Sequence, residues 1–357
     1  MGLKHGREAR QKIEHNLAVY FKRFKNETEL SRDQALHRAS KYREVIKRQD
    51  PFYARAMEGL AEGSGQDPLE IVALNVRYEL MYSQFSKIGL KTLLGTDGCT
   101  SFAVLPEASR NGHLLMGQNW DWIPGVEGLF LKIRNPSGPA VLCFTEAGVV
   151  GGKIGLNSDG LGLLINGLVS DRDDWSRLQK PFHVRCWQVL RSRTLGQAVR
   201  KIIEGQRSCS ANFLMGQQKT LTSGRTVDIE SAPGATCELA PDRGAIGHTN
   251  HFSDSEKLGV QQVLDEERRS TLQRFRRIQR LLDERVRSGG KLSVSGAQEM
   301  LRDHDGRPES VCRHPNTGLR EDERYKTVVS VLMDLHSRKL WATMGSPCAN
   351  EYQSLSL

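Results

Sequence analysis

The sequence lacks long apolar runs and Cys-x-x-Cys pairs, and we expect no secretory leader. No window approaches about 18 consecutive apolar residues, which excludes an ordinary membrane-spanning helix. The seven cysteines include no Cys-x-x-Cys pair, and residues 1–8 lack the apolar core of a secretory signal. An odd cysteine count in such a chain argues against a disulfide framework. We therefore expect reduced thiols and a cytoplasmic protein. A peroxisomal location is less expected, because the last residues, Leu355-Ser-Leu357, match a peroxisomal signal only poorly.

Aromatic residues are also scarce, at 6% of the chain, although the formal net charge is +9 at pH 7. A nucleic-acid-binding surface normally combines clustered cations with a recognisable binding motif. Here lysine and arginine are interleaved with acids, as in Glu266-Glu-Arg-Arg269. We therefore expect neither nucleic acid nor a membrane as a partner. The hydrophobic content of 38% is typical of a globular protein.

Apolar periodicity divides the chain into a helical first part and a strand-rich remainder. Residues 5–88 repeat apolar side chains at helical spacing, with a predicted turn at 59–65 and a helix over 71–81. Further helices are expected at 181–204, 260–287 and 295–303. The expected strands are 100–105, 113–118, 129–134, 141–146, 161–166, 212–216, 225–230, 327–334 and 339–344. This order predicts a layered α+β domain with an antiparallel core.

Cys99 is singled out by its position. The segment Leu94-Gly-Thr-Asp-Gly-Cys-Thr-Ser-Phe-Ala-Val104 places it at the start of a strand, directly after a glycine-rich turn. A thiol beside Gly98 can attack the preceding carbonyl because glycine has no side chain to obstruct the approach. An N→S acyl shift followed by hydrolysis would cut the chain between Gly98 and Cys99. A structural cysteine at a strand edge is the alternative interpretation.

Cleavage at this point would give Cys99 a free α-amino group. The reference pKa of that amine is about 7.7–8.0 and that of a thiol is about 8.5, so the two groups can exchange a proton near neutrality. One residue would then supply both the nucleophile and the general base. No separate catalytic histidine is required by this chemistry.

Four downstream segments offer partners for Cys99. Each contains a polar side chain, or a pair of them, next to a predicted strand or in a polar loop. They are Gly117-Gln-Asn-Trp-Asp121, the glycine-rich residues 148–167 ending near Asn166, His248-Thr-Asn-His251 and Ser310-Val-Cys-Arg-His314.

These segments also have purely structural interpretations. Asp121 and Asn166 are residue types that form turns readily. Cys312 is interpreted as a buried neighbour of Arg313. His248 and His251 resemble a metal-binding pair, but they lack a third ligand at suitable spacing, so we predict no metal site.

The same residues resemble the acyl-coenzyme A:6-aminopenicillanic acid acyltransferase family of cysteine N-terminal-nucleophile (Ntn) hydrolases. The likeness implies a four-layer αββα sandwich with two stacked antiparallel sheets flanked by helices. It implies one domain made of a small, mostly helical subunit, residues 1–98, and a large subunit, residues 99–357, held together as a heterodimer. Six motifs in order over Gly2 to Pro347 carry the likeness: Cys99-Thr-Ser, Gly117-Gln-Asn-Trp-Asp, Thr145-Glu-Ala-Gly, Gly155-Leu-Asn-Ser, His248-Thr-Asn-His and Val311-Cys-Arg-His.

The resemblance also implies a role for each partner residue. Asp121 would orient the Cys99 amine, and Arg313 would pair with Asp121 and favour the thiolate. The Asn250 side chain would donate to the oxyanion, and the region of Asn166 would supply a second donor. No cofactor and no metal are expected. The substrate would be a small acyl amide or acyl thioester, with acyl-coenzyme A as a co-substrate.

Departures from the family pattern leave the substrate open. Family members usually have a strand before Gly-x-x-His-Gly, whereas this chain starts at Gly2-Leu-Lys-His-Gly6, and extra residues near 107–111 indicate a longer hairpin. Gln118 stands where bile salt hydrolases have arginine, which argues against a bile-acid substrate. A non-penicillin amide is an equal candidate. Two alternatives to an Ntn enzyme are a non-catalytic binding homologue and a papain-like protease. The protease would need its cysteine on a helix.

Overall fold

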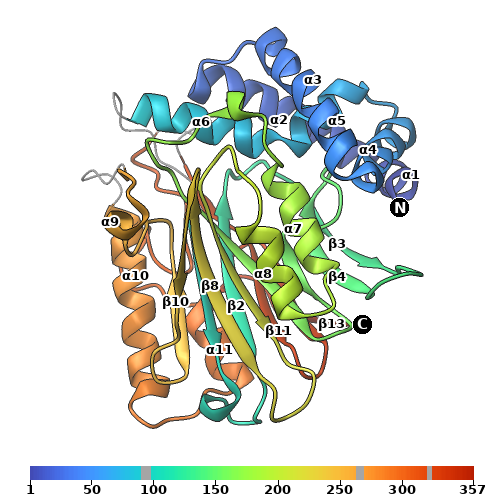
Figure 1. The fold of residues 1–357 in the computed structure, drawn as a ribbon. Coiled ribbons are helices and arrows are strands. Elements are labelled where there is room, and N and C mark those ends of the chain that lie inside the picture. The colour runs from blue at the N-terminus through green and yellow to red at the C-terminus, as the bar shows by residue number, and fades with distance from the viewer. Residues whose placement is uncertain (90–97, 263–268, 320–323) are drawn as a thin grey trace.

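Two antiparallel β-sheets stacked face to face form the centre of the molecule, with helices on their outer faces (Figure 1). The structure is a computed structural model that describes residues 1–89, 98–262, 269–319 and 324–357. Within these ranges the strand order is β10-β1-β2-β11-β12-β13 in one sheet and β3-β4-β5-β6-β7-β8-β9 in the other. The layered α+β class and the αββα sandwich expected from the sequence are confirmed.

The strands are short, and the central ones are buried along their whole length because both of their faces are covered. The first sheet contains β1 (Gly98–Val104), β2 (Leu115–Trp122), β10 (Ala245–His248), β11 (Lys326–Asp334), β12 (Lys339–Met344) and β13 (Gln353–Ser356). The second contains β3 (Gly128–Ile133), β4 (Val141–Glu146), β5 (Ile154–Asn157), β6 (Leu161–Gly167), β7 (Ala211–Gln217), β8 (Arg225–Ala232) and β9 (Ala235–Leu239).

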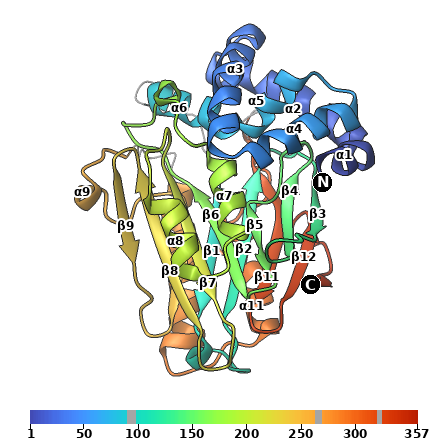
Figure 2. The same ribbon diagram turned by 45° about the vertical axis from the view of Figure 1, so that its right-hand side comes forward.

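Two pairs of helices cover the sheets (Figure 2). The helices α10 (Arg269–Leu282) and α11 (Val294–Leu301) pack on the first sheet and bury an apolar cluster against it. The helices α7 (Phe182–Leu190) and α8 (Leu195–Ile203) pack on the second sheet. Shorter helical segments are Pro106–Ala108, Trp175–Arg177, α9 (Ser255–Leu258) and Asp283–Arg287.

The N-terminal helices form a cap across one end of the sandwich (Figure 1). Local signals fix where they begin: Asp50 and Asp67 each accept hydrogen bonds from the first turn and precede a proline at the first helical position. None of the helices in the described ranges is long and apolar enough to cross a bilayer. The cap consists of α1 (Gly2–Glu8), α2 (Arg10–Thr28), α3 (Arg32–Gln49), α4 (Pro51–Ser64), α5 (Pro68–Asn75) and α6 (Arg77–Gly89).

A buried ion-pair cluster joins the cap to the sandwich. Glu146, at the end of β4, is 1% exposed and pairs with Arg77 of α6 and with Lys153. Tyr20 of α2 donates a hydrogen bond to the same carboxylate. Burial by itself raises the pKa of Glu146, but Arg77 and Lys153 outweigh burial and hold it well below its usual range. The carboxylate is therefore ionised, and removing it would leave two buried cations uncompensated.

The turn predicted at 59–65 is wrong, because α4 runs through these glycines to Ser64. A Cβ on Gly59 would lie 2.8 Å from the Leu3 nitrogen, and one on Gly6 would lie 2.6 Å from the Leu60 oxygen. The glycines therefore serve to bring the backbones of α1 and α4 into direct contact. Only Gly65, with φ of +70°, ends the helix.

Three predicted helices have different boundaries in the structure. The helix expected at 181–204 is two helices, because Arg191 ends the first and Thr194 caps the second by accepting from the Gln197 N–H. The helix expected over 71–81 is likewise divided at Val76. Of the helix expected at 260–287, residues 263–268 lie outside the described residues, and the regular α-helix spans Arg269–Leu282.

Candidate active site

Cys99 lies on a central strand rather than at a sheet edge. It is the second residue of β1, which pairs with β10 on one side and with β2 on the other. In the pairing with β2, Cys99 is opposite Trp120 and Gly98 is opposite Asp121. Cys99 has no exposed surface. The papain-like arrangement is excluded, because Cys99 is on a strand and not on a helix. The turn expected at 94–97 lies outside the described residues.

The backbone of Cys99 is held by three polar side chains from three separate segments. Its N–H donates to Asn250 Oδ1 at 2.6 Å. Its carbonyl oxygen accepts from Arg274 Nη1 at 2.5 Å and from Asn166 Nδ2 at 3.4 Å. The residue expected to react is therefore fixed on both sides of its α-carbon.

Gly98 is enclosed by two of the predicted partner residues. A Cβ at this position would lie 2.5 Å from Arg313 Nη1 and 3.0 Å from Asp121 Oδ2. From the sequence, glycine at position 98 was expected because it leaves its carbonyl open to attack. The structure adds a second reason, since the space that a side chain would need is filled by a carboxylate and a guanidinium.

Thr327 connects Asp121 with Arg313. It is opposite Asp121 in the pairing of β11 with β2, next to a register shift between Thr327 and Val329. Its hydroxyl donates to Asp121 Oδ1 at 2.7 Å and accepts from the Arg313 N–H at 3.0 Å. Such irregularities are common beside active sites because they redirect side chains. Thr327 was expected only as the first residue of a strand.

Arg313 is 7% exposed and forms an ion pair with Glu309. Its guanidinium also lies 5.1 Å from the ring centroid of Tyr325. Arg313 and Asp121, the ion-pair partner expected from the sequence, both lie against Gly98, and their pairing stays a prediction. Neither Glu309 nor Tyr325 was predicted as part of the site.

Arg274 is the main component that sequence reasoning missed. It lies on α10, is 2% exposed, and binds the Cys99 carbonyl, Thr100 Oγ1 at 3.1 Å and Asn250 Oδ1 at 3.2 Å. Burial lowers the pKa of Arg274, and the neighbouring Asp121 carboxylate opposes that shift. One signal was available: Arg274 is four residues before Ile278 and in phase with the buried apolar face of the helix.

Asn250 and Asn166 lie where predicted, but their side chains have specific orientations. Asn250 presents its oxygen to Cys99, while its Nδ2 donates to the Gly167 oxygen at 3.1 Å. Asn166 directs its Nδ2 toward the Cys99 carbonyl and accepts from Ser101 Oγ at 2.7 Å. The roles of both residues as oxyanion donors stay predictions. In this state the Asn250 amide nitrogen is already used by a backbone oxygen.

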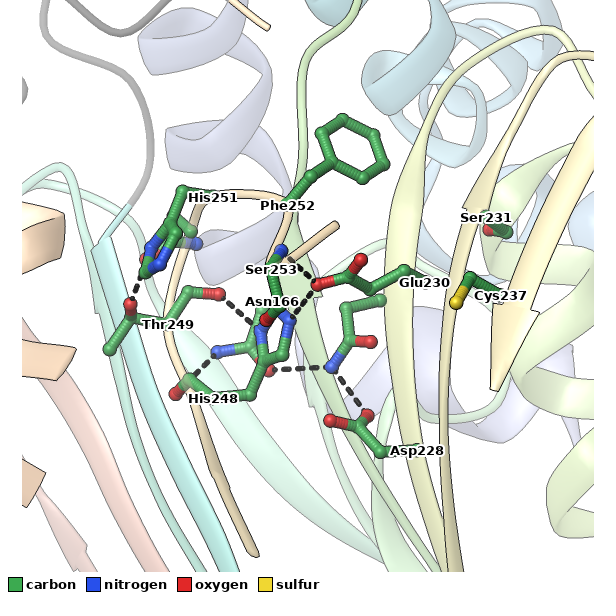
Figure 3. A network of polar contacts seen from close by, with 12 residues as sticks. Asn166, Asp228, Glu230, Ser231, Cys237, His248, Thr249, His251, Phe252 and Ser253 are labelled. Carbon is green, nitrogen blue, oxygen red and sulfur yellow. Dashed lines mark hydrogen bonds and ion pairs between the residues drawn. The ribbon is translucent and has the colours of Figure 1, made fainter. Parts of the chain in front are cut away.

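A network of buried polar side chains lies next to Asn166 and contacts its side-chain oxygen (Figure 3). Asn212 Nδ2 lies 3.4 Å from Asn166 Oδ1 and donates to Asp228 Oδ1 at 2.7 Å. His248 contacts Glu230 at 2.8 Å through Nε2. Burial lowers the pKa of His248, but the Asp228 and Glu230 carboxylates outweigh burial and raise it. The two carboxylates therefore favour the protonated form of His248.

The possible metal pair of His248 and His251 is not favoured by this geometry. His248 Nδ1 contacts the Thr249 oxygen at 2.6 Å, so both of its ring nitrogens are engaged. His251 Nδ1 lies 3.1 Å from Thr249 Oγ1 and 3.2 Å from Thr271 Oγ1. These histidines organise the loop that carries Asn250.

Comparison with known proteins supports the sequence-based resemblance. A profile of the family described as acyl-coenzyme A:6-aminopenicillanic acid acyl-transferase matches residues 108–349. The matched range begins after Cys99 and contains Asp121, Asn166, Asn250 and Arg313. A curated relative, the 40 kDa form of acyl-coenzyme A:6-aminopenicillanic-acid-acyltransferase from Emericella nidulans, is 29% identical over 308 residues, which cover 85% of this chain and 78% of the relative.

Solved structures with a similar fold are more distant. An N-acylethanolamine-hydrolyzing acid amidase orthologue from Caenorhabditis elegans has a TM-score of 0.47 and 15% identity, and the match covers 66% of this chain and 93% of that one. A mutant conjugated bile acid hydrolase from Clostridium perfringens has a TM-score of 0.45 and 11% identity, with 72% and 97% coverage.

Proposed function

Because the chain belongs to the acyl-coenzyme A:6-aminopenicillanic acid acyltransferase family, we propose that it cleaves or forms amides through a thioester on Cys99. The observation that carries this proposal is the convergence on the Gly98–Cys99 peptide. Asp121 and Arg313 enclose Gly98, whereas Asn250 and Arg274 hold the Cys99 backbone. Four polar side chains around one strand residue exceed what a structural cysteine needs.

The first step of the proposed function is self-cleavage. The Cys99 thiol adds to the Gly98 carbonyl carbon, the Gly98–Cys99 C–N bond breaks, and a thioester forms while the nitrogen becomes the Cys99 amine. Water then hydrolyses the thioester, giving a carboxyl group on Gly98 and restoring the thiol. Arg313 is placed beside Gly98, where its charge stabilises both the developing oxyanion and the final carboxylate.

Gly98→Ala is expected to slow this step about tenfold to a hundredfold. The added methyl group takes the space of the Arg313 guanidinium and displaces it from its place beside Gly98. The fraction of cut chain, followed over time after cell-free synthesis, measures the rate. Gly196→Ala is the matched control, because an added Cβ there meets only Arg200 Nη1 at 3.9 Å. Equal rates for the wild type and the Gly98 variant would contradict the proposed role of this packing.

The second step uses the new N-terminus. The Cys99 amine takes the thiol proton, and the thiolate attacks the carbonyl carbon of an acyl amide or acyl thioester. The C–N or C–S bond of the substrate then breaks, the Cys99 ammonium returns a proton to the leaving amine or thiol, and the acyl group stays on Cys99 as a thioester. Asn250 Oδ1, which accepts from the Cys99 N–H in the uncut chain, is placed to accept from the amine as well. The acyl group then leaves to water or to an amine. Acyl-coenzyme A fits this scheme as a co-substrate.

Substrate entry requires rearrangement around Cys99, which is fully buried in the uncut chain. The cavity lined by Val19, Lys22, Arg23 and residues 123–125 has a volume of about 430 Å³ and adjoins the end of β2. Arg23 reaches the Tyr325 hydroxyl, and Tyr325 in turn contacts Arg313. The lining also contains Glu27, which pairs with Arg23 at 2.6 Å. Its apolar residues suit an acyl group.

A substrate panel tests the proposed reaction. Cut protein is incubated with N-acyl amides, and separately with acyl thioesters plus a small amine, while released amine and new amide are measured by mass spectrometry. We expect turnover of at least one class and a trapped acyl group on the peptide that begins with Cys99. Fully cut protein that turns over neither class and forms no acyl adduct would contradict the proposed reaction and favour a binding role.

A further inference from the structure

A second group of reactive side chains lies outside the network around Cys99. His304, Cys312, His314 and Cys348 come from the polar loop after α11 and from the turn after β12. One ligand atom from each residue lies within 4.8 Å of all the others. In the described parts of the chain this is the one group of three or more His, Cys, Asp or Glu side chains close enough to bind a metal ion.

The three distances from His314 Nε2 to the other ligand atoms are close to those of a tetrahedral site. His314 Nε2 lies 3.1 Å from His304 Nε2, 3.7 Å from Cys312 Sγ and 3.5 Å from Cys348 Sγ. Zinc binds histidine nitrogen at about 2.0–2.1 Å and cysteine sulfur at about 2.3 Å, so neighbouring ligand atoms of a tetrahedral site are roughly 3.3–3.8 Å apart. The three separations agree with this range within a few tenths of an ångström.

We propose that His304, Cys312, His314 and Cys348 bind one Zn²⁺ ion in a closed Cys₂His₂ site. Two thiolates and two imidazoles form the donor set that zinc prefers, and four protein ligands leave no open position for a substrate. The site is therefore structural. Binding releases the two thiol protons to solvent and involves no change of oxidation state.

No metal was predicted from the sequence, where only His248 and His251 were considered as ligands. The spacing of the four residues proposed here matches no common zinc motif. Cys312 and His314 are two residues apart, His304 is ten residues before His314, and Cys348 follows it by 34. Only the fold joins them. The Cys312 N–H donates to the Asp303 oxygen at 2.9 Å, and the His314 N–H donates to the Pro308 oxygen at 3.0 Å, so the loop already has a fixed conformation.

The place of the site gives it a consequence for the catalytic residues. Cys312 and His314 flank Arg313, the residue that encloses Gly98. A metal ion bound on both sides of Arg313 would tie its backbone to the turn that carries Cys348. Zinc would thus hold the loop that positions the guanidinium, without contacting substrate.

The metal content of the purified protein tests the proposal. The full chain is produced with added zinc, dialysed without chelator and analysed by plasma mass spectrometry. We expect about one zinc per wild-type chain and at least a tenfold lower content in Cys348→Ser, whose side chain is exposed, so that folding is retained. Cys237→Ser is the control and should keep its zinc, because this cysteine is buried in β9 and outside the group.

Cobalt replacement gives an independent measurement. Chelator-stripped protein titrated with Co²⁺ should develop the visible absorption of a tetrahedral site and a near-ultraviolet thiolate band, both weakened in Cys348→Ser. A wild type that contains no zinc and takes up neither metal would overturn the proposal. So would an intact mass that shows a Cys312–Cys348 disulfide, or equal zinc content in Cys348→Ser. None of these outcomes depends on self-cleavage or turnover.

Discussion

Cys99→Ala is expected to stay a single chain of 357 residues, while the wild type separates on a denaturing gel into residues 1–98 and 99–357. The variant loses the only atom that can attack the Gly98 carbonyl in the proposed mechanism. Turnover should fall at least about 10³-fold, because nucleophile and general base are lost together. Intact-mass spectrometry and N-terminal sequencing of the large piece measure the cut, and the large piece should begin with cysteine.

Two further variants make this result specific. Cys99→Ser keeps a weaker nucleophile and should be cut slowly rather than not at all. Cys237→Ala removes another buried thiol and should be cut like the wild type. If Cys99→Ala were cut at the wild-type rate, or if the uncut wild type were fully active, both self-cleavage and the N-terminal nucleophile would be refuted.

Arg274→Leu is expected to lower both the rate of self-cleavage and kcat by about 10²-fold, with a smaller change in KM. The substitution removes the Arg274 hydrogen bonds to the buried Cys99 carbonyl and to the half-buried Asn250 Oδ1. Asn166 still donates to the Cys99 carbonyl and the Cys99 N–H to Asn250 Oδ1, so the loss is that of hydrogen bonds from a charged donor, each contributing about 1.5–3 kcal/mol. Stopped-flow or discontinuous kinetics on cut protein gives kcat and KM, and calorimetry gives the thermal midpoint.

Two other arginine variants separate orientation from folding. Arg274→Lys keeps the charge but cannot donate in two directions from a planar group, so its kcat should lie between those of the wild type and Arg274→Leu. Arg276→Leu changes an exposed arginine on the same helix and should have no effect. Should Arg274→Leu lower the thermal midpoint while kcat stays at the wild-type value, Arg274 would be a purely structural residue.

The sequence predicted the layers of the fold better than the ends of its elements. Strands such as β4 and β11 are recognisable because their apolar residues form short runs between turn residues. The glycines at 59–65 were misinterpreted because glycine is common both in turns and in close helix contacts, and only the presence of α1 distinguishes the two. The edge strand β13, which is largely exposed, was not predicted because its four residues contain a single apolar side chain, Leu355.

The residues of the candidate site also fall into those that the sequence predicted and those that it did not. Cys99, Asp121 and Arg313 were found because they occur in recognisable short motifs. Arg274 and Glu309 were not, since their importance arises from contacts between segments far apart in the chain. A charged residue on a helix is usually in solvent, and only the packing of α10 on the first sheet makes Arg274 an interior residue.

The buried ion pairs around Glu146 acquire a different meaning if the chain is cut as proposed. Arg77 and Tyr20 would belong to one polypeptide and Glu146 and Lys153 to the other, so these contacts would become the affinity determinants of a subunit interface. Unfolding of the uncut chain is unimolecular, whereas unfolding of the cut protein also separates two molecules. The thermal stability of the cut protein would then depend on protein concentration, whereas that of the uncut chain would not. The active form would therefore stay folded longer when more of it is present.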